Sequence, residues 1–246
     1  MDRIIEISNL TAQYDGETIL EDISIDIYRN DITVILGKSG CGKTTLLKNI
    51  LRLYQPSQGK IKVFGQDITG MEESDFDQIL VKIGVLFQNG ALLNSIKVWE
   101  NVAIPLEQHT DLPDSIIKRL VQKKLEMVEL PFASNLYPAQ LSGGMRKRAA
   151  LARAIAMDPL LLFGDEPSAG LDPVTSLALD NLLLKLREFL NMTLVIVTHE
   201  LSSIRRIADR IIFLDKGKVI FQGKLKEGEN SDKPEVQQFF NPTGRR

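Results

Sequence analysis

The feature that most limits the folds open to this sequence is a glycine-rich stretch between a strand pattern and a helix pattern. An apolar run at residues 32–36 is typical of a buried strand, and apolar residues at helical spacing follow the glycines over residues 44–53. The stretch itself consists of Gly37, Lys38, Ser39, Gly40, Cys41, Gly42, Lys43, Thr44 and Thr45. It satisfies the pattern G-x-x-x-x-G-K-[ST] in the strand–loop–helix context that the pattern requires. The sequence therefore predicts a phosphate-binding loop on an α/β fold.

Each residue type in this loop has a chemical reason. Glycines let backbone N–H groups converge on phosphates, and the N-terminus of the following helix adds the positive end of its dipole. We expect Lys43 to reach the outer phosphates and Thr44 to ligate Mg²⁺. A plain glycine turn would not require lysine and threonine at these two positions. Cys41 is expected to be a small buried residue rather than a redox group.

The patterns in the rest of the chain place this loop in a larger α/β domain. Near the N-terminus, Ile23, Ile25 and Ile27 alternate with polar residues, and Asp15-Gly16 predicts a hairpin turn. Strand patterns recur at residues 160–163, 194–197 and 211–214, with a helix pattern at 182–190 between the first two. Strands that alternate with helices predict a mostly parallel sheet.

We therefore expect one domain of 246 residues with recognisable parts. Residues 1–95 and 158–225 are expected to form the α/β core, with an antiparallel β-subdomain at its N-terminal end. Residues 96–157, mostly helical in pattern and punctuated by prolines, are expected to form an inserted helical subdomain. Residues 226–246 are expected to form a tail that begins with a loose polar linker at 226–234.

Composition excludes several kinds of partner and compartment. The net charge of −2 and the pI of about 5.8 provide no basic surface of the kind that nucleic-acid binding requires, so no nucleic acid partner is expected. Cys41 is the only cysteine, which excludes an internal disulfide and favours the reducing cytoplasm. No apolar stretch approaches the roughly 20 residues that span a bilayer. If the protein acts at a membrane, another subunit must supply the membrane-spanning part.

Two carboxylates follow the strand pattern at residues 160–163. Asp165 and Glu166 would lie at the carboxyl end of a parallel strand, where ligands bind in sheets of this type. Asp165 fits a magnesium partner that acts through water, and Glu166 fits the group that orients or deprotonates an attacking water.

A second glycine motif lies far downstream of the phosphate loop, at residues 141–145. Ser142 precedes a run rich in helix formers and is a natural N-cap for that helix. The motif offers a helix N-terminus to an anion but has no lysine of its own. It therefore makes chemical sense mainly as half of a site whose other half comes from another subunit.

The order of these motifs resembles that of the nucleotide-binding subunit of ATP-binding cassette (ABC) transporters over nearly the whole chain. The resemblance is carried by residues 37–45, Gln88, 141–145, 160–166, 168–172 and His199. Its most specific element is the Leu-Ser-Gly-Gly signature at 141–144, which separates this family from other phosphate-loop proteins. The resemblance implies a P-loop NTPase of the ABC ATPase type that hydrolyses ATP with Mg²⁺ and drives a membrane permease.

The resemblance also implies roles for single residues. Tyr14 would stack on adenine, Gln88 would sense the γ-phosphate and magnesium, and His199 would contact the γ-phosphate. The implied catalytic set is Glu166, His199, Lys43 and Gln88, and the implied magnesium set is Thr44, Gln88 and Asp165.

In this family the signature of one subunit faces the phosphate loop of the other. Asp172 would lie in the loop that links the two sites. The residues that would act on the partner's ATP are Ser142, Gly143, Gly144 and Met145. One set of motifs in one chain predicts a homodimer.

Several segments are similar to the ATPase of Mla-type, MCE-associated lipid transporters. They are residues 87–93, 98–106, 141–156 and 234–240, and the signature continues with Met145 where many relatives have glutamine. The similarity implies phospholipid as cargo, a permease with an MCE-type lipid-binding protein as partners, and a position on the cytoplasmic face of the inner membrane. Asn89-Gly90 with Leu93 departs from the subfamily, which usually has a small residue before the glycine and an aromatic at the end.

Two alternatives remain at this stage. One is a soluble ABC-type ATPase without a permease, of the iron–sulfur assembly type, and the other is an ABC ATPase for a non-lipid cargo. A DNA-repair or chromosome-structure ATPase would need a long coiled coil between the two glycine motifs, and this segment is too short and too rich in proline.

Overall fold

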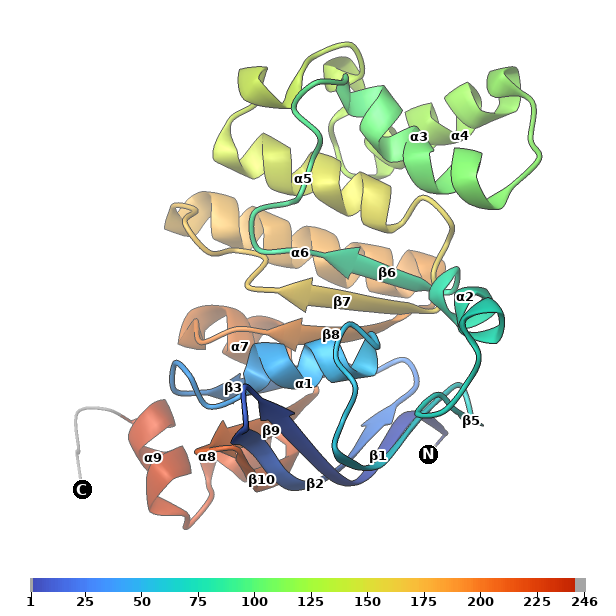
Figure 1. Cartoon of the computed structure of the whole chain (residues 1–246). Coiled ribbons are helices and arrows are strands. Elements are labelled where there is room, and N and C mark those ends of the chain that lie inside the picture. The colour runs from blue at the N-terminus through green and yellow to red at the C-terminus, as the bar shows by residue number, and fades with distance from the viewer. Residues whose placement is uncertain (1, 242–246) are drawn as a thin grey trace. The chain divides into compact units, whose positions relative to one another are not determined.

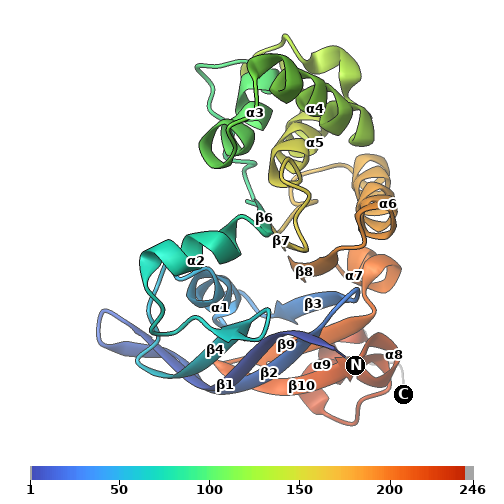
Figure 2. The same ribbon diagram turned by 90° about the vertical axis from the view of Figure 1, so that its right-hand side faces the viewer.

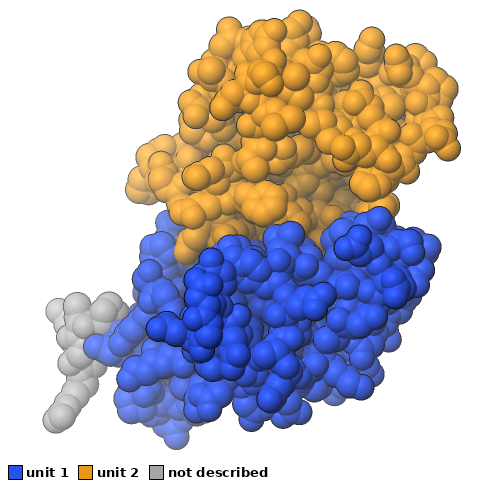
Figure 3. Space-filling view, viewed as in Figure 1, with its two compact units in different colours: residues 1–80, 195–246 blue, residues 81–194 orange. Residues whose placement is uncertain are grey.

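The chain forms two compact units in the computed structural model, which describes residues 2–241. Unit 1 comprises residues 1–80 and 195–246, and unit 2 comprises residues 81–194 (Figure 3). Unit 2 therefore includes strands and a helix of the α/β pattern in addition to the helical segment at 96–157.

The first sheet of unit 1 is antiparallel and has four strands in the order β2-β1-β4-β5. Its strands are β1 (Arg3–Tyr14), β2 (Glu17–Tyr28), β4 (Gln58–Val63) and β5 (Gln66–Asp67). The predicted alternation holds in β2, where Ile23, Ile25 and Ile27 are buried. The predicted hairpin turn is also present: Asp15 and Gly16 have φ angles of 48° and 82°, as a tight hairpin between twisted strands requires.

The second sheet in unit 1 contains the strand that leads into the phosphate loop. This strand, β3 (Ile32–Gly37), is buried throughout and pairs in parallel with β9 (Arg210–Asp215), with Val34 opposite Ile211. Strand β10 (Lys218–Lys224) pairs antiparallel with β9. The pairing of β3 and β9 begins at a polar contact, because the Ile32 amide donates to the Asp209 carboxylate at 2.8 Å.

The described residues of unit 1 form five helices: α1 (Lys43–Ile50), α2 (Glu73–Leu80), α7 (Leu201–Ile207), α8 (Leu225–Glu229) and α9 (Pro234–Phe240). Helix α1 contacts both β2 and β3, so it packs against both sheets of the unit (Figure 2). Its apolar face buries Leu46, Leu47 and Ile50.

The C-terminal segment is more ordered than the sequence predicts. A loose linker over residues 226–234 is wrong in part, because α8 forms there and Gly228 packs where a Cβ would lie 2.2 Å from Ile211 Cδ1. In α9, Val236 and Phe240 are buried, and the Phe239 ring lies edge-on to Phe213 with the ring centres 5.6 Å apart. Contacts with β9 hold this segment in place.

Unit 2 contains two parallel strands and one long helix. Strand β6 (Ile83–Leu86) pairs with β7 (Leu161–Asp165), and α6 (Pro173–Leu190) follows β7 (Figure 1). Helix α6 begins at Pro173, well before the predicted start at 182, because Asp172 caps it and proline suits its first position. The strand β8 (Thr193–Val197) then carries the chain from unit 2 into unit 1.

The rest of unit 2 is helical, as the sequence predicts for residues 96–157. It contains α3 (Val98–His109), α4 (Asp114–Met127) and α5 (Gly143–Ala154), with short 3-10 turns at Pro131–Ala133 and Pro138–Gln140. The three α-helices contact one another, and α5 also contacts β6. Glycine permits this last approach, since a Cβ on Gly84 would lie 2.3 Å from the Ala154 carbonyl oxygen. Within residues 2–241, no helix is both long and apolar enough to cross a bilayer.

Candidate functional site

The phosphate loop connects the end of β3 to the start of α1, as the sequence predicts. Gly37, Gly40 and Gly42 have φ angles of 148°, 76° and 103°, which side chains rarely tolerate. Gly42 is constrained by space as well, because a Cβ there would lie 2.5 Å from Leu20 Cδ2. The backbone thus takes a shape that only glycine permits, and α1 begins at Lys43 directly behind it.

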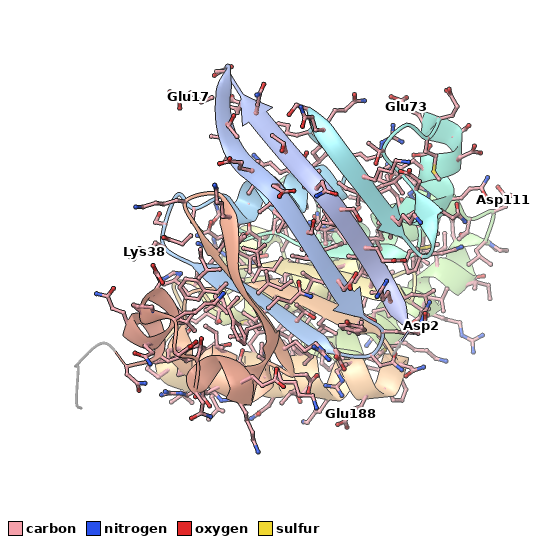
Figure 4. All side chains as sticks on the ribbon, turned by 90° about the horizontal axis from the view of Figure 1, so that it is seen from below. Asp2, Glu17, Lys38, Glu73, Asp111 and Glu188 are labelled. Carbon is pink, nitrogen blue, oxygen red and sulfur yellow. The ribbon has the colours of Figure 1, made fainter. Side chains whose placement is uncertain are left out.

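The Lys43 ammonium is held inside this loop. Its Nζ donates to the carbonyl oxygens of Gly37 at 2.9 Å and Lys38 at 3.0 Å. These contacts place a positive charge where the loop amides and the α1 N-terminus also favour an anion. Thr44 is exposed, so its hydroxyl is accessible to a ligand, and Lys38 lies at the outer edge of the loop (Figure 4).

Cys41 is buried in the loop, as expected for a small packing residue. Burial raises the pKa of its thiol, against the opposing influence of the Lys43 charge. Its carbonyl accepts from the Gly217 amide at 3.3 Å, so the turn between β9 and β10 supports the loop. The cysteine therefore serves packing rather than chemistry.

Tyr14 ends β1 and is 53% exposed, which leaves a ring face accessible for stacking. It contacts Tyr54, with ring centres 5.7 Å apart, and the Lys48 ammonium lies 4.8 Å from the centre of the Tyr54 ring. The sequence alone assigns no role to Tyr54. Its position four residues after the end of α1 could have indicated that a second aromatic ring lies near the phosphate loop.

His199 lies in unit 1, two residues after β8 ends. Its side chain is exposed, and the preceding Thr198 is anchored to β3 through a hydrogen bond from its amide to the Ile35 carbonyl, 3.3 Å long. Unit 1 therefore carries Tyr14, the phosphate loop and His199.

Asp165 and Glu166 lie in unit 2, at the carboxyl end of β7 as predicted, and both are half-buried. Glu166 has a φ of 47°, which is unusual for a residue with a long side chain. Its carbonyl oxygen accepts from the Ala169 amide at 3.1 Å and from Lys147 Nζ at 3.2 Å. The turn after β7 is thus fixed by hydrogen bonds to the Glu166 backbone.

Gln88 follows β6 in the same unit, and its side chain is exposed. Its backbone carbonyl accepts a hydrogen bond from Lys147 Nζ, the same ammonium that contacts Glu166. Burial lowers the pKa of Lys147 below its ordinary value, while the charges of Glu166 and Asp165 oppose that shift. Lys147 thus brings two predicted site residues together, and the sequence reading did not single it out.

The second glycine motif forms the N-terminus of α5, and the predicted N-cap is confirmed. Ser142 Oγ accepts from the Met145 amide at 3.3 Å. Ser142 and Gly143 are exposed, so the first amides of α5 face outward with the positive end of the helix dipole. Gly144 packs closely on α6, because a Cβ there would lie 2.5 Å from Thr175 Cγ2.

Asp172 is the N-cap of α6, a local role that the sequence reading did not assign. Its carboxylate accepts from the amides of Val174 at 3.0 Å and Thr175 at 3.1 Å, and from the Thr175 hydroxyl. The hydrogen bond from the Thr175 side chain holds the pKa of Asp172 below its usual 3.8. Unit 2 therefore carries Gln88, Asp165, Glu166, the motif at 142–145 and Asp172.

Comparisons with known proteins point in one direction. The family model described as ABC transporter matches residues 20–169. The chain is 41% identical to the intermembrane phospholipid transport system ATP-binding protein MlaF of Haemophilus influenzae, over 96% of this chain and 90% of that protein. It is 38% identical to the protein named probable ribonucleotide transport ATP-binding protein mkl of Mycobacterium leprae, over 98% of this chain and 69% of that protein.

A solved structure agrees with these matches. The ATP-binding cassette MJ0796, described as a dimer in a post-hydrolysis state bound to ADP and Pi, superposes with a TM-score of 0.82 at 31% identity. The superposition covers 90% of this chain and 98% of that one.

Proposed function

The chain belongs to the ABC transporter family, and on that premise we propose that it is the ATPase subunit of a phospholipid transporter, acting as a homodimer on an integral membrane permease. One observation carries the chemical part of this proposal. The outward-facing N-terminus of α5 has the geometry of an anion site, yet it brings no lysine of its own. A second subunit that presents its phosphate loop would complete it.

Within one subunit, the phosphate loop holds ATP. The loop amides and the Lys43 ammonium bind the β- and γ-phosphates, and the exposed ring of Tyr14 stacks on adenine. The Tyr54 ring beside Tyr14 extends this apolar surface. The hydrogen bond from the Gly217 amide to the Cys41 carbonyl stabilises the conformation of the loop.

The donor set fits Mg²⁺. The Thr44 hydroxyl, the Gln88 amide oxygen and the Asp165 carboxylate are oxygen ligands, and Mg²⁺ in such sites keeps waters and substrate phosphates as its other ligands. Residues 2–241 contain no cluster of three histidine, cysteine or acidic side chains that would hold a metal without a phosphate. When bound with ATP, the ion would offset the negative charge of the phosphates.

Hydrolysis needs a group that orients water and a group that contacts the γ-phosphate. Glu166 is assigned the first role, because it follows a buried strand directly and its backbone is fixed by hydrogen bonds. His199 and Gln88 are assigned contacts with the γ-phosphate, in keeping with their exposed positions at strand ends.

The homodimer follows from the two anion sites. Ser142, Gly144 and the first amides of α5 would close on the γ-phosphate held by the partner's Lys43. Hydrolysis then removes the anion that bridges the two subunits, so that bond cleavage favours opening of the dimer. The dimeric state described for MJ0796 with ADP and Pi supports this arrangement.

The permease contact is assigned to the loop after β6, residues 87–93. Phe87 and Leu93 are exposed on it, and Asn101 fixes its end through hydrogen bonds to the Leu93 amide at 2.7 Å and carbonyl at 3.1 Å. A rigid loop with exposed apolar side chains suits a short helix of a permease. The similarity to MlaF supports phospholipid as cargo, an MCE-type lipid-binding protein in the complex, and a position on the cytoplasmic face of the inner membrane.

E166Q tests the chemical part of the proposal. ATP binding should persist, steady-state hydrolysis should fall by on the order of 100-fold or more, and ATP should now trap a dimer visible by analytical ultracentrifugation. Undiminished hydrolysis would remove Glu166 from its role. A protein that stays monomeric with ATP in the E166Q form would remove the composite site.

The cargo is tested with the native complex. The protein is purified with its copurifying permease, reconstituted in liposomes, and assayed for ATP-dependent transfer of a fluorescent phospholipid and of a labelled ribonucleotide. We expect transfer of the phospholipid alone. Ribonucleotide transfer would favour the activity that the name of mkl indicates, and the lack of any membrane partner would favour a soluble ATPase.

A further inference from the structure

Lys147 is a buried cation on the helix that begins with the second glycine motif. Only 7% of the residue is exposed, whereas the neighbouring Arg146 is exposed on the same helix. The Lys147 ammonium donates to two backbone carbonyls, that of Gln88 and that of Glu166. A buried charge is costly unless it is hydrogen-bonded, so these contacts hold the side chain in one place.

The contact with Glu166 supports an unusual backbone conformation. Glu166 lies in the left-handed region of backbone conformations, with a φ of 47°. This conformation is unfavourable for a residue with a Cβ, so surrounding contacts must stabilise it. Two donors contact its carbonyl: the Ala169 amide lies within the same turn, and the Lys147 ammonium comes from α5. Lys147 therefore links this turn to a separate element, helix α5.

The contact with Gln88 is part of a broader attachment to α5. One turn and a half further along the helix, Arg153 donates to the carbonyls of Gly90 at 2.8 Å and Ala91 at 2.7 Å. Gly90 lies against the helix, because a Cβ there would be 3.1 Å from Ala150 Cβ. The loop after β6 thus rests on α5 at several points, and Lys147 secures the residue assigned to the γ-phosphate.

We propose that Lys147 is a positioning residue for ATP hydrolysis, which fixes the backbones of Gln88 and Glu166 to each other and to the helix whose N-terminus carries the signature. The proposal rests on the function proposed above. In this proposal α5 has two roles. Its first turn contacts the nucleotide bound by the partner, and Lys147 in its second turn positions Gln88 and Glu166. Displacement of α5 would move both groups together.

The test compares K147M with a matched control on the same helix, R148M. Arg148 is also a half-buried cation that ties α5 to a neighbouring element, through hydrogen bonds to the Val128 carbonyl at 3.1 Å and the Glu129 carboxylate at 2.6 Å. Both partners lie at the end of α4, far in sequence from Gln88 and Glu166. In both variants methionine keeps an unbranched apolar side chain and removes the charge and the donors.

We expect K147M to lower kcat for ATP hydrolysis by on the order of 10- to 100-fold, as a displaced catalytic group does, with the ATP concentration at half saturation changed less than about twofold. R148M should keep kcat within about twofold of wild type. K147R, which restores donors, should recover part of the rate. A kcat for K147M equal to that of R148M would overturn the proposal.

A multiple variant separates positioning from general loss of structure. If Lys147 acts through Gln88 and Glu166, then K147M added to a variant that carries both Q88A and E166Q should leave the residual single-turnover rate of that variant unchanged. Multiplied losses would show that Lys147 acts elsewhere. If K147M does not fold, K147Q is judged by the same criteria, and inactivity of the wild-type protein itself would refute the proposed function rather than this role.

Discussion

Gly144 of the signature packs so closely against Thr175 that the substitution G144A should destabilise the protein. A Cβ on Gly144 would lie 2.5 Å from Thr175 Cγ2, well inside normal contact distance. The φ of Gly144 is not positive, so alanine itself meets no backbone strain. Thr175 is not free to rotate, because its hydroxyl donates to the Asp172 carboxylate. The new methyl group must therefore displace either α5 or the cap of α6.

The magnitude follows from two opposing effects. Overpacking of this kind costs about 1–3 kcal/mol, and alanine in place of glycine inside a helix gains about 0.5–1 kcal/mol. G144A should thus lower the free energy of unfolding by about 1 kcal/mol, within a range of about 0–2.5 kcal/mol. T175S removes the obstructing methyl group and keeps the hydroxyl, so G144A should cost little or nothing when combined with T175S.

The assay is urea denaturation of wild type, G144A, T175S and the double variant, followed by circular dichroism. The interaction energy between the two substitutions should equal the relieved overpacking, about 1–3 kcal/mol in favour of the double variant. G143A is the matched control, since a Cβ there would meet only Leu171 Cδ2 at an ordinary 3.6 Å. Equal losses for G143A and G144A, or a loss for G144A that T175S does not relieve, would refute the reasoning.

The remaining predictions concern charge at the two glycine motifs and at the α6 cap. K43M should weaken ATP binding about 10- to 100-fold, the range for loss of charged hydrogen bonds, and an unchanged Kd by calorimetry would contradict a phosphate contact. S142D should preserve the cap of α5 and its unfolding midpoint while abolishing hydrolysis, because its charge would repel the partner's phosphate; retained activity would speak against the composite site. The lowered pKa of Asp172 means that its contribution to stability is present above 3.8 and is lost as pH falls through the lower folded value. The urea midpoint of wild type should therefore fall more steeply below pH 4 than that of D172N, and identical pH curves would contradict the carboxylate's role.

Local signals explain what the sequence could predict. Three predicted features depend only on residues that are close in sequence, and all three are present. They are the phosphate loop, the Ser142 cap and the hairpin turn at Asp15-Gly16. Glycine, proline and capping residues act on the backbone directly, so their pattern is visible in the chain itself.

Lys147 shows why other parts of the site were missed. In the sequence it stands in a run of three cations, which normally indicates a solvated helix face. Its partners are carbonyls 59 and 19 residues away, and a carbonyl has no sequence signature. Its position on the helix could have indicated burial, because Lys147 lies one turn before the buried Ala150 and Leu151 and therefore shares their face.

The C-terminal segment was underestimated for a related reason. Its polar composition hides the few residues that pack, among them Gly228 and Val236. Gly228 matters through the absence of a side chain, which lets α8 approach Ile211. Close approach between distant segments depends on the tertiary fold, so a pattern within the segment cannot reveal it.

The pairing of β3 with β9 has a consequence for synthesis of the protein on the ribosome. The Ile32 amide and the Asp209 carboxylate that begin this pairing are 177 residues apart, and all of unit 2 is translated between them. At 5–20 residues per second, β3 is made about 10 to 35 s before its neighbour exists. During that interval a strand that is buried throughout in the folded protein lacks its native partner, while the contiguous unit 2 can already fold. The nascent chain is therefore most vulnerable to aggregation through β3, and chaperones would act on this protein mainly before β9 leaves the ribosome.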